Sequence, residues 1–192
     1  MSIAVIGAGK WGQALHYAIS RNFVCKITSR EKKSLENFVE LEEALACEYL
    51  IFALPAQVVR TWLETHFRFK AQKILVAAKG IEQGSGAFLN EIFSAYVPEE
   101  NLGFLSGPSF AAEVMQGLPT AVVINSTNEA LSKEFSYFFP SFIKTYTSKD
   151  VIGAEVCGAY KNVLAIASGI CAGLNLGNNA RASLIARGLV EM

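Results

Sequence analysis

Lys161 is the single charged residue between Glu155 and Arg181, in a run whose other residues are apolar, small or uncharged. A helix that is apolar nearly all the way round is typical of a buried helix, so we expect Lys161 to be buried. A buried ammonium loses its proton readily, which is why such lysines act as acids and bases. The alternative is a structural lysine whose stem lies along the core while its ammonium reaches water.

A glycine-rich turn, Gly7-Ala-Gly9-Lys-Trp-Gly12, directly follows the strand-like residues 3–6 and opens a helix-like segment. In a dinucleotide fingerprint the first glycine makes the tight turn, the second admits the pyrophosphate and the third lets the helix approach the strand. Unpaired N–H groups at the start of that helix attract the anion. The turn therefore predicts an NAD or NADP site, and the alternative is an ordinary strand–helix turn rich in glycine.

The residues after the second expected strand bear on the choice of cofactor. An Asp or Glu at this place bonds the ribose 2′-hydroxyl of NAD. Here the strand runs into Ser29 and Arg30, with Lys32 and Lys33 close behind. Because Arg30 can pair with a 2′-phosphate, the sequence favours NADP(H) or the use of both cofactors. Glu31 is close enough that NAD alone remains open.

An alternation of short apolar runs and helix-like segments must position these residues. Such an alternation predicts βαβ units and a parallel sheet covered on both faces. We expect strands at 3–6, 25–28, 49–53, 74–78, 102–105, 121–124 and 143–146, and helices at 11–22, 57–67, 87–96 and 129–139. The expected fold class is therefore α/β, with a Rossmann-like, doubly wound, mostly parallel sheet.

The pattern changes near residue 150. Beyond it only helical signals remain: a helix over 153–174, a turn over 175–179 and a helix that runs into Met192 without a C-cap. We therefore expect an NAD(P)-binding Rossmann-like domain over 1–149. Residues 150–192 then form the beginning of an all-helical substrate domain that is cut short.

Composition narrows the other classes of function. Seventeen basic and seventeen acidic residues leave a formal net charge of zero, so we expect no nucleic-acid partner. The basic cluster around Arg30 is better explained as a solvated turn with a cofactor role. No Cys-x-x-Cys pair is present and only two histidines, His16 and His66, accompany the cysteines, so we expect no metal site.

Although hydrophobic residues make up 52% of the chain, we expect a soluble cytoplasmic protein. The N-terminus lacks the basic segment of a signal peptide. The apolar stretch after Lys161 is interrupted by Gly169 and Gly173, so it falls short of the ~20 apolar residues of a membrane span. The scattered cysteines fit reduced, mostly buried thiols; they are Cys25, Cys47, Cys157 and Cys171.

Six motifs follow one another along the chain. They are Gly7–Gly12, Val76-Ala-Ala-Lys79-Gly80, Ser106-Gly107-Pro108-Ser109-Phe110-Ala111-Ala112-Glu113, Tyr160-Lys161-Asn162-Val163-Leu164-Ala165, Asn179-Ala-Arg-Ala and Arg187-Gly-Leu-Val-Glu-Met192. In order and spacing they resemble the bacterial form of NAD(P)-dependent glycerol-3-phosphate dehydrogenase. The resemblance extends from residue 3 to residue 192.

The resemblance implies a reversible hydride transfer between NAD(P)H and C2 of dihydroxyacetone phosphate, giving sn-glycerol 3-phosphate for phospholipid synthesis. It makes Lys161 the proton donor to the forming C2 alkoxide and puts Lys79 beside the substrate carbonyl. Cations prearranged there would stabilise the developing charge, and two lysines in a water-poor site would lower each other's pKa. Taken alone, Lys79 could equally be a solvated loop lysine.

The resemblance also implies two sets of binding residues. The substrate set is Lys79, Gly107, Ser109 and Asn162, and the cofactor set is Gly7, Gly9, Lys10, Trp11, Gly12, Arg30, Lys79 and Ala111. For Ser109 an alternative is a cap on the short helix that follows, a role that is compatible with ligand contact.

Other interpretations stay open because the chain departs from the family beyond residue 192. The family's helical domain continues with an aspartate and a Ser-Arg-Asn segment that hold the substrate phosphate, and neither is present. The apolar helix then lacks partners, and such faces mark an interaction site, for example a homodimer through the helical region, or an aggregation liability. The alternatives are a non-catalytic dinucleotide-binding module and a related hydroxy-acid or 6-phosphogluconate-type dehydrogenase. The Gly-Pro-Ser-Phe-Ala motif and Lys79 argue against the latter.

Overall fold

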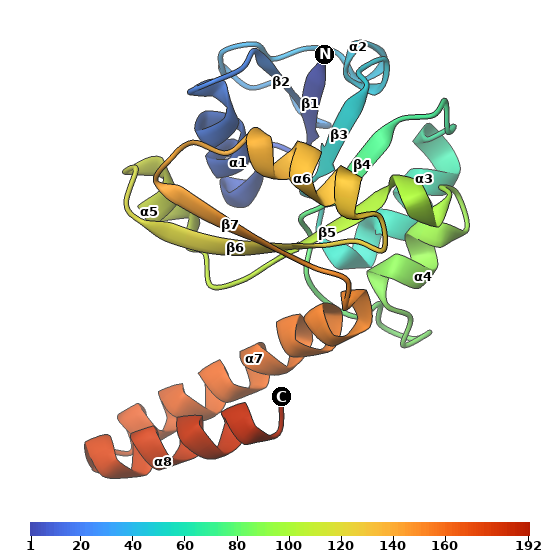
Figure 1. The fold of residues 1–192 in the computed structure, drawn as a ribbon. Helices are drawn as coiled ribbons and strands as arrows, with labels where there is room; N and C mark the ends of the chain where they lie inside the picture. Colours follow the sequence, from blue (N-terminus) through green and yellow to red (C-terminus); the bar gives the residue numbers. More distant parts are fainter.

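The computed structural model describes residues 1–192 as a layered α/β body from which a helical hairpin projects (Figure 1). One sheet of seven strands forms the middle layer, in the order β2-β1-β3-β4-β5-β6-β7. The strands are β1 (Ile3–Ile6), β2 (Cys25–Thr28), β3 (Tyr49–Phe52), β4 (Lys73–Val76), β5 (Leu102–Ser106), β6 (Thr120–Asn125) and β7 (Ile143–Ser148). All neighbours run parallel except β5 and β6, which are antiparallel. The expected mostly parallel sheet is confirmed.

Six α-helices belong to the body and two form the hairpin. They are α1 (Lys10–Ser20), α2 (Leu41–Leu45), α3 (Val59–His66), α4 (Leu89–Ser94), α5 (Ala111–Met115), α6 (Glu129–Tyr137), α7 (Val151–Gly173) and α8 (Gly177–Val190). Every strand and long helix expected from the sequence is present, with ends displaced by one or two residues. The sequence prediction missed α2, because five residues are too few to show a helical period.

Both faces of the sheet are covered, because alternate strand residues point to opposite sides. Val5 and Ile51 belong to a cluster of 22 buried residues that also takes in side chains of α1, α5 and α6. Their neighbours Ile6 and Phe52 belong to a second cluster of 18, completed by α2, α3 and α4. The two clusters are similar in size, as expected of a doubly wound fold.

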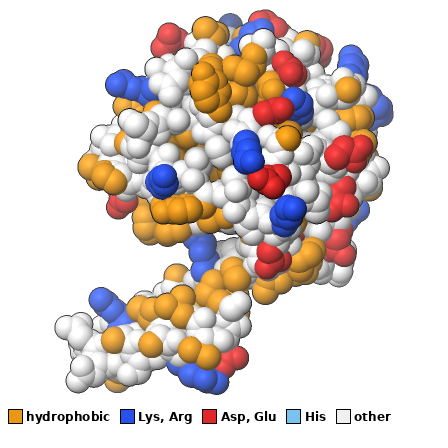
Figure 2. Space-filling model, in the orientation of Figure 1, with side chains coloured by type: hydrophobic (Ala, Val, Ile, Leu, Met, Phe, Trp, Pro, Cys, Tyr) orange, Lys and Arg blue, Asp and Glu red, His pale blue; other side chains and the backbone are white.

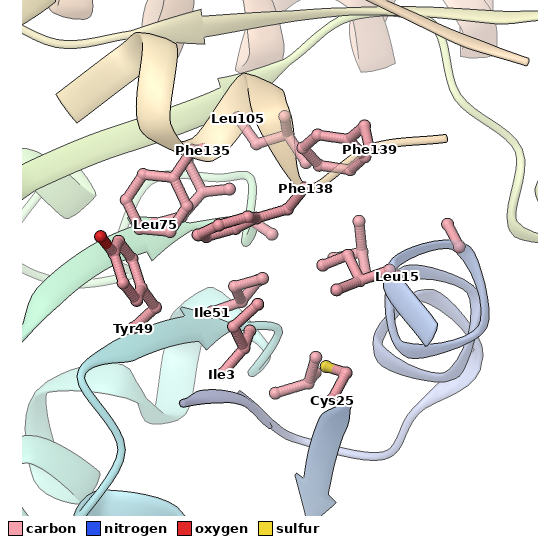
Figure 3. Close-up of a cluster of buried hydrophobic side chains, with 14 of the residues drawn as sticks. Ile3, Leu15, Cys25, Tyr49, Ile51, Leu75, Leu105, Phe135, Phe138 and Phe139 are labelled. Atoms are coloured by element: carbon pink, nitrogen blue, oxygen red, sulfur yellow. The ribbon is translucent and has the colours of Figure 1, made fainter. Parts of the chain in front are cut away.

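Aromatic side chains fill the first cluster, which Figure 3 shows in close-up. Phe135 and Phe138, at the end of α6, pack against Tyr49 of β3 with ring centroids 5.7 and 4.8 Å away and nearly perpendicular planes. Leu15 from α1 faces the same cluster from the other side. This packing holds α1, and with it the glycine turn, against the sheet.

The strand order also fixes where a ligand would bind. From β1 the chain crosses to β2 on one side, and later returns to β3 on the other side of β1. In open sheets of this kind ligands bind outside the carboxyl ends of the strands at such a switch point. The glycine turn after β1 and Lys79 after β4 lie at this edge.

The hairpin of α7 and α8 differs from the body, because it has almost no core. No residue of α7 is buried, and Gly188 is the one buried residue of α8. The expectation that α7 is a buried helix is therefore wrong. An apolar sequence predicts the helix, but burial requires a partner surface, and α8 covers only one side of α7 (Figure 1).

Two further expectations about this region are also wrong. The apolar stretch was expected to be too short for a membrane span, but α7 runs unbroken for 23 residues from Val151 to Gly173. By length and composition alone α7 is apolar enough to cross a membrane, which is weak evidence for a single helix. The second helix ends at Val190 rather than at Met192.

Only Cys25 and Cys47 are buried, whereas Cys157 and Cys171 in α7 are half-buried; all four are free.

Candidate dinucleotide and substrate site

The glycine turn has the geometry of a tight strand–helix connection. Gly7 has a φ of 107°, a backbone conformation that suits glycine, and a Cβ there would lie 2.8 Å from the carbonyl oxygen of Ala53. A Cβ on Gly12 would lie 1.8 Å from the carbonyl oxygen of Gly7, so only glycine lets α1 pass this close. A Cβ on Gly9 would meet nothing within 4 Å. The turn is therefore closed behind Gly7 and Gly12 and open in front of Gly9.

Lys33 is a cation at this turn, and the sequence predicts no separate role for it. Its Nζ donates a 2.6 Å hydrogen bond to the carbonyl oxygen of Ala8. Arg30 instead extends into solvent, with 93% of its side chain exposed and its guanidinium 3.6 Å from the Glu31 carboxylate. Both cations stand at the end of β2, but only Lys33 contacts the turn.

Trp11 connects the glycine turn to the end of β4. Its indole Nε1 donates a hydrogen bond of 3.2 Å to the carbonyl oxygen of Ala77, two residues before Lys79. The preceding residue, Lys10, is exposed at the start of α1. The β1–α1 turn and the β4 end therefore form one continuous edge.

Lys79 is the most strongly perturbed cation at this edge. Its Nζ donates a 2.8 Å hydrogen bond to the carbonyl oxygen of Gly107, which follows β5. Burial, and after it the charge of Lys161, lowers the pKa of Lys79 to about 8. The alternative of a solvated loop lysine does not fit this environment. A lysine with a pKa near neutrality, at the carboxyl edge of the sheet, can exchange a proton at physiological pH.

Lys161 and Asn162 lie on α7, and both are exposed. The charge of Lys161 is nonetheless near enough to act on Lys79. The charge of Lys161 therefore contributes to lowering the pKa of Lys79, while the expected burial of Lys161 is not found. The side chain of Asn162 has no hydrogen-bond partner among the interactions of the chain.

A small pocket separates Lys79 from α7. It is lined by Ala78, Lys79, Gly80, Leu89, Phe104, Ser106, Ala154, Glu155 and Gly158. A larger cavity, of about 350 Å³, lies at the start of α7 and contains none of the residues predicted from the sequence. Of the residues predicted from the sequence, Lys79 therefore lies in the smaller pocket.

The Gly-Pro-Ser-Phe-Ala motif forms the connection from β5 to α5. Gly107 has a φ of 117°, and a Cβ there would lie 3.0 Å from the carbonyl oxygen of Ala121 in β6. Ser109 is half-buried and does not cap the helix, because Phe110 is the N-cap residue of α5 and no side chain bonds its amides. Ala111 opens α5 and packs against the cluster that includes α1. The motif thus connects the end of β5 to α5 beside Lys79, which bonds Gly107 O.

Glu155 is a site residue that the sequence argument passed over. Its carboxylate oxygens accept hydrogen bonds from the backbone N–H of Asn90 at 3.1 and 3.3 Å. Burial raises the pKa of Glu155 to about 7, although the amides of Asn90 and Leu89 favour its charged form. The sequence did hold a signal: Glu155 is the last acid before an apolar run, and such a carboxyl needs a partner.

The residues of the turn fit a dinucleotide. The space in front of Gly9 is open to a pyrophosphate, and the first amides of α1 have no side-chain cap that would occupy them. Lys33 and Arg30 supply positive charge on the adenosine side. A bound NAD(P) would therefore lie across the β1 and β4 ends, with its nicotinamide towards Lys79.

Fold and site together define a dinucleotide-binding α/β protein of the dehydrogenase type, with a lysine-containing pocket beside the cofactor edge. Comparison with known proteins narrows this class. The sequence model of the NAD-dependent glycerol-3-phosphate dehydrogenase N-terminus matches residues 30–132, and that of the C-terminus matches residues 150–192. The chain belongs to the NAD-dependent glycerol-3-phosphate dehydrogenase family.

Individual relatives agree with this assignment. Glycerol-3-phosphate dehydrogenase [NAD(P)+] of Sulfurimonas denitrificans is 65% identical over 190 residues, which are 99% of this chain and 64% of that protein. The crystal structure of the Coxiella burnetii glycerol-3-phosphate dehydrogenase superposes with a TM-score of 0.85 at 31% identity, over 99% of this chain and 66% of that one. The Plasmodium falciparum enzyme, with a TM-score of 0.87 at 20% identity, covers 100% of this chain and 64% of its own and supports the fold alone.

The family match excludes the related dehydrogenases as an alternative, and it leaves the non-catalytic dinucleotide-binding module open. The chain belongs to the glycerol-3-phosphate dehydrogenase family and not to that of the hydroxy-acid or 6-phosphogluconate dehydrogenases. The chain spans just under two thirds of the length of the curated relatives it matches. Whether it turns over substrate or only binds the dinucleotide is a question for experiment.

Proposed function

We propose that this chain carries the dinucleotide site and both lysines of an oxidoreductase that reversibly transfers hydride between NAD(P)H and dihydroxyacetone phosphate, giving sn-glycerol 3-phosphate. One observation carries the proposal. Lys79, with its pKa lowered to about 8, lies at the carboxyl edge of the sheet and is hydrogen-bonded to Gly107 O, within electrostatic range of Lys161. Such an arrangement suits a carbonyl oxygen that gains negative charge.

In this proposal the cofactor lies against the first amides of α1. Gly7 and Gly12 shape the turn, Gly9 leaves room for the pyrophosphate, and Lys10, Trp11 and Ala111 flank the cofactor. Because Arg30 adds positive charge where a 2′-phosphate would lie, we propose NADP(H) as the preferred cofactor, with NAD(H) also accepted.

Lys79 and Lys161 have different roles in the reaction. Bound nicotinamide supplies or accepts the hydride at C2. Lys79 donates a hydrogen bond to the carbonyl oxygen and orients it, and Lys161 gives its proton to the forming alkoxide and recovers it in the reverse direction. Burial lowers the pKa of Lys79, so the pH profile of turnover in Lys79→Met should be compared with that in Lys161→Ala. Gly107, Ser109 and Asn162 line the substrate side.

We also propose a domain organisation, a cellular role and an oligomeric state. Residues 1–149 form the dinucleotide domain and residues 150–192 begin the helical substrate domain. The product supplies phospholipid synthesis in the cytoplasm. A homodimer through α7 and α8 would cover their exposed apolar side chains, which Figure 2 shows on the hairpin; sedimentation at several concentrations tests this part.

The deciding experiment is a titration of the 192-residue chain with NADH and NADPH, followed by dihydroxyacetone phosphate while the reduced nicotinamide is monitored. Binding followed by oxidation supports the whole proposal, and Lys161→Ala and Lys79→Met should then abolish turnover but not binding. Binding without oxidation, which we expect, limits the chain to the dinucleotide-binding part. Absence of binding would contradict the proposal at its base. Lys70→Ala, which removes an exposed lysine away from the site, is the matched control.

A further inference from the structure

The junction between the body and α7 depends on one polar side chain. Glu155 lies in the second turn of α7, and its carboxylate accepts the Asn90 amide in the first turn of α4. The neighbouring Leu89 amide also favours this carboxylate, and no other side chain of residues 151–192 makes a hydrogen bond or ion pair with residues 1–147. Apart from this link, α7 meets the body through apolar contacts such as that of Val151.

Glu155 and Lys161 are six residues apart on α7, with Gly158 between them. Residues spaced three or four apart share one face of a helix, so Glu155 and Gly158 lie on the same face and Lys161 follows one turn further. Ala154, Glu155 and Gly158 all line the pocket that holds Lys79. Ala154 and Gly158 are small, and Glu155 lines the same pocket while its carboxylate bonds the Asn90 amide of α4.

The distance of Lys161 from Lys79 is therefore set by how α7 sits on the body. Lys79 is fixed by its bond to Gly107 and belongs to the sheet edge. Lys161 has no partner in the body, and its position is defined only by the helix that carries it. Movement of α7 away from α4 would separate the two lysines and open the pocket to water.

From this geometry we infer that Glu155 is a positioning residue: its carboxylate, bound to the Asn90 amide, docks α7 against α4 and so holds Lys161 opposite Lys79. Four ionisable groups act around this pocket: Glu155 and Lys161 on α7, Glu91 on α4 and Lys79 after β4. Glu155 need not touch substrate or cofactor to have this effect. The inference rests on the proposed function in one respect: that function assigns both lysines to the same reaction.

Two variants separate docking from the charge of Glu155. Glu155→Gln keeps the reach and an acceptor oxygen but removes the charge, whereas Glu155→Asp keeps the charge but shortens the side chain by one methylene. If Glu155 docks α7, Asp releases the helix, and the pKa of Lys79 moves from about 8 towards the ordinary lysine value, while Gln leaves it near 8. If only the charge matters, Asp leaves the pKa of Lys79 unchanged and Gln lowers it.

The measurement is competitive acetylation of the 192-residue chain across pH, with the reactivity of Lys79 read by mass spectrometry. A rise of the pKa of Lys79 from 8 to 9 would lower its free-amine fraction at pH 8 about fivefold. We expect this loss in Glu155→Asp and Glu155→Ala, but not in Glu155→Gln or in Glu64→Gln, an exposed carboxylate on α3. An unchanged Lys79 in Glu155→Asp, or a lowered pKa in Glu155→Gln, overturns the inference.

Hydrogen exchange at the Asn90 amide gives a second readout that the fold as a whole does not control. Exchange there should accelerate in Glu155→Asp and Glu155→Ala relative to the rest of α4, and recover in Glu155→Gln. Equal exchange in all variants would also overturn the inference. Neither measurement requires turnover, so a chain that fails to oxidise NADPH contradicts the proposed function and leaves this test intact.

Discussion

The body and the hairpin are both rich in apolar residues, but only the body buries them. Each strand from β1 to β5 presents side chains to two covered faces, and residues such as Phe52 and Phe135 are fully buried. In α7, Ile166 is 67% exposed and Val163 58%. The difference shows that apolar periodicity specifies an element, whereas its burial depends on whether a complementary surface is present.

The two regions differ in their chemistry for the same reason. Lys79 belongs to the body, where burial lowers its pKa to about 8. Lys161 belongs to the hairpin and is exposed. The lysine that the sequence singled out as buried is the exposed one, because α7 has few neighbours to exclude water from it.

Truncating a core side chain should expose the largest difference between the regions. Phe135→Ala leaves a cavity in the cluster of Figure 3 and should lower the free energy of unfolding by about 3–5 kcal/mol. Ile166→Ala in α7 should change it by less than about 0.5 kcal/mol. Urea denaturation measures both. A large loss in Ile166→Ala would mean that the α7 face is covered in solution, and sedimentation would show by what.

Glycine-to-alanine substitutions should have opposite signs in the two regions. Gly12→Ala forces a Cβ against the backbone of Gly7 and should cost about 1–3 kcal/mol together with most nucleotide binding. Gly169→Ala, inside α7 near its C-terminal end, meets nothing within 4 Å and should stabilise the hairpin by about 0.5–1 kcal/mol. Thermal denaturation and NADPH titration test the pair. A neutral Gly12→Ala would contradict the tight turn.

Gly9→Ala separates binding from stability within the same turn. Its φ of −71° is ordinary for alanine, and the added Cβ points into open space, so stability should stay the same. NADPH affinity should nevertheless fall, because that space is where the pyrophosphate would lie. Unchanged affinity would place the dinucleotide elsewhere.

The sequence allowed most of the body to be predicted, because local signals and tertiary packing agree there. Strand periodicity, the glycine turn and Lys79 after β4 all lie where the alternation of strands and helices puts them. Lys33 and Glu155 could not be placed in the same way. Lys33 reaches the turn from 25 residues away and Glu155 reaches α4 from 65 residues away, and no local pattern encodes such contacts.

The junction should also respond to pH, with slopes of opposite sign from its two perturbed groups. In the folded state Glu155 keeps its proton up to about pH 7, whereas its ordinary pKa is 4.5. The folded state therefore binds more protons between these values, and stability falls as pH rises through this window. Lys79 loses its proton near pH 8 in the folded state and at 10.5 ordinarily, so stability rises with pH between those values.

Two substitutions show which group causes each slope of stability against pH. Glu155→Gln should remove the fall between about pH 4.5 and 7, and Lys79→Met should remove the rise between about 8 and 10.5. Urea midpoints across pH give both slopes, and Glu64→Gln, which lies in neither environment, should leave them unchanged. If Lys79→Met keeps the alkaline rise, burial of Lys79 is not its cause.

The smallest effects concern cofactor choice, and they test two cations of the body that follow β2. Lys33 holds the Ala8 carbonyl of the glycine turn, so Lys33→Ala should weaken NADH and NADPH alike by a few-fold. Arg30 contacts no part of the turn, and its loss should matter only for a 2′-phosphate, by about tenfold for NADPH and not for NADH. Lys70→Ala, an equal loss of charge away from the turn, should change neither.

Titration calorimetry measures the affinity of each variant for NADH and NADPH. A result opposite to the expectation for Arg30→Ala or Lys33→Ala would reassign the role of that residue. If Arg30→Ala leaves NADPH affinity unchanged while Lys33→Ala lowers it selectively, Lys33 is the residue that reads the 2′-phosphate, despite its bond to Ala8. The 2.6 Å hydrogen bond to Ala8 need not break on binding, because an ammonium carries three N–H donors and can bind the carbonyl and a phosphate together. Equal losses for both cofactors in Lys33→Ala instead assign it to the shape of the turn, and leave the choice of cofactor to Arg30.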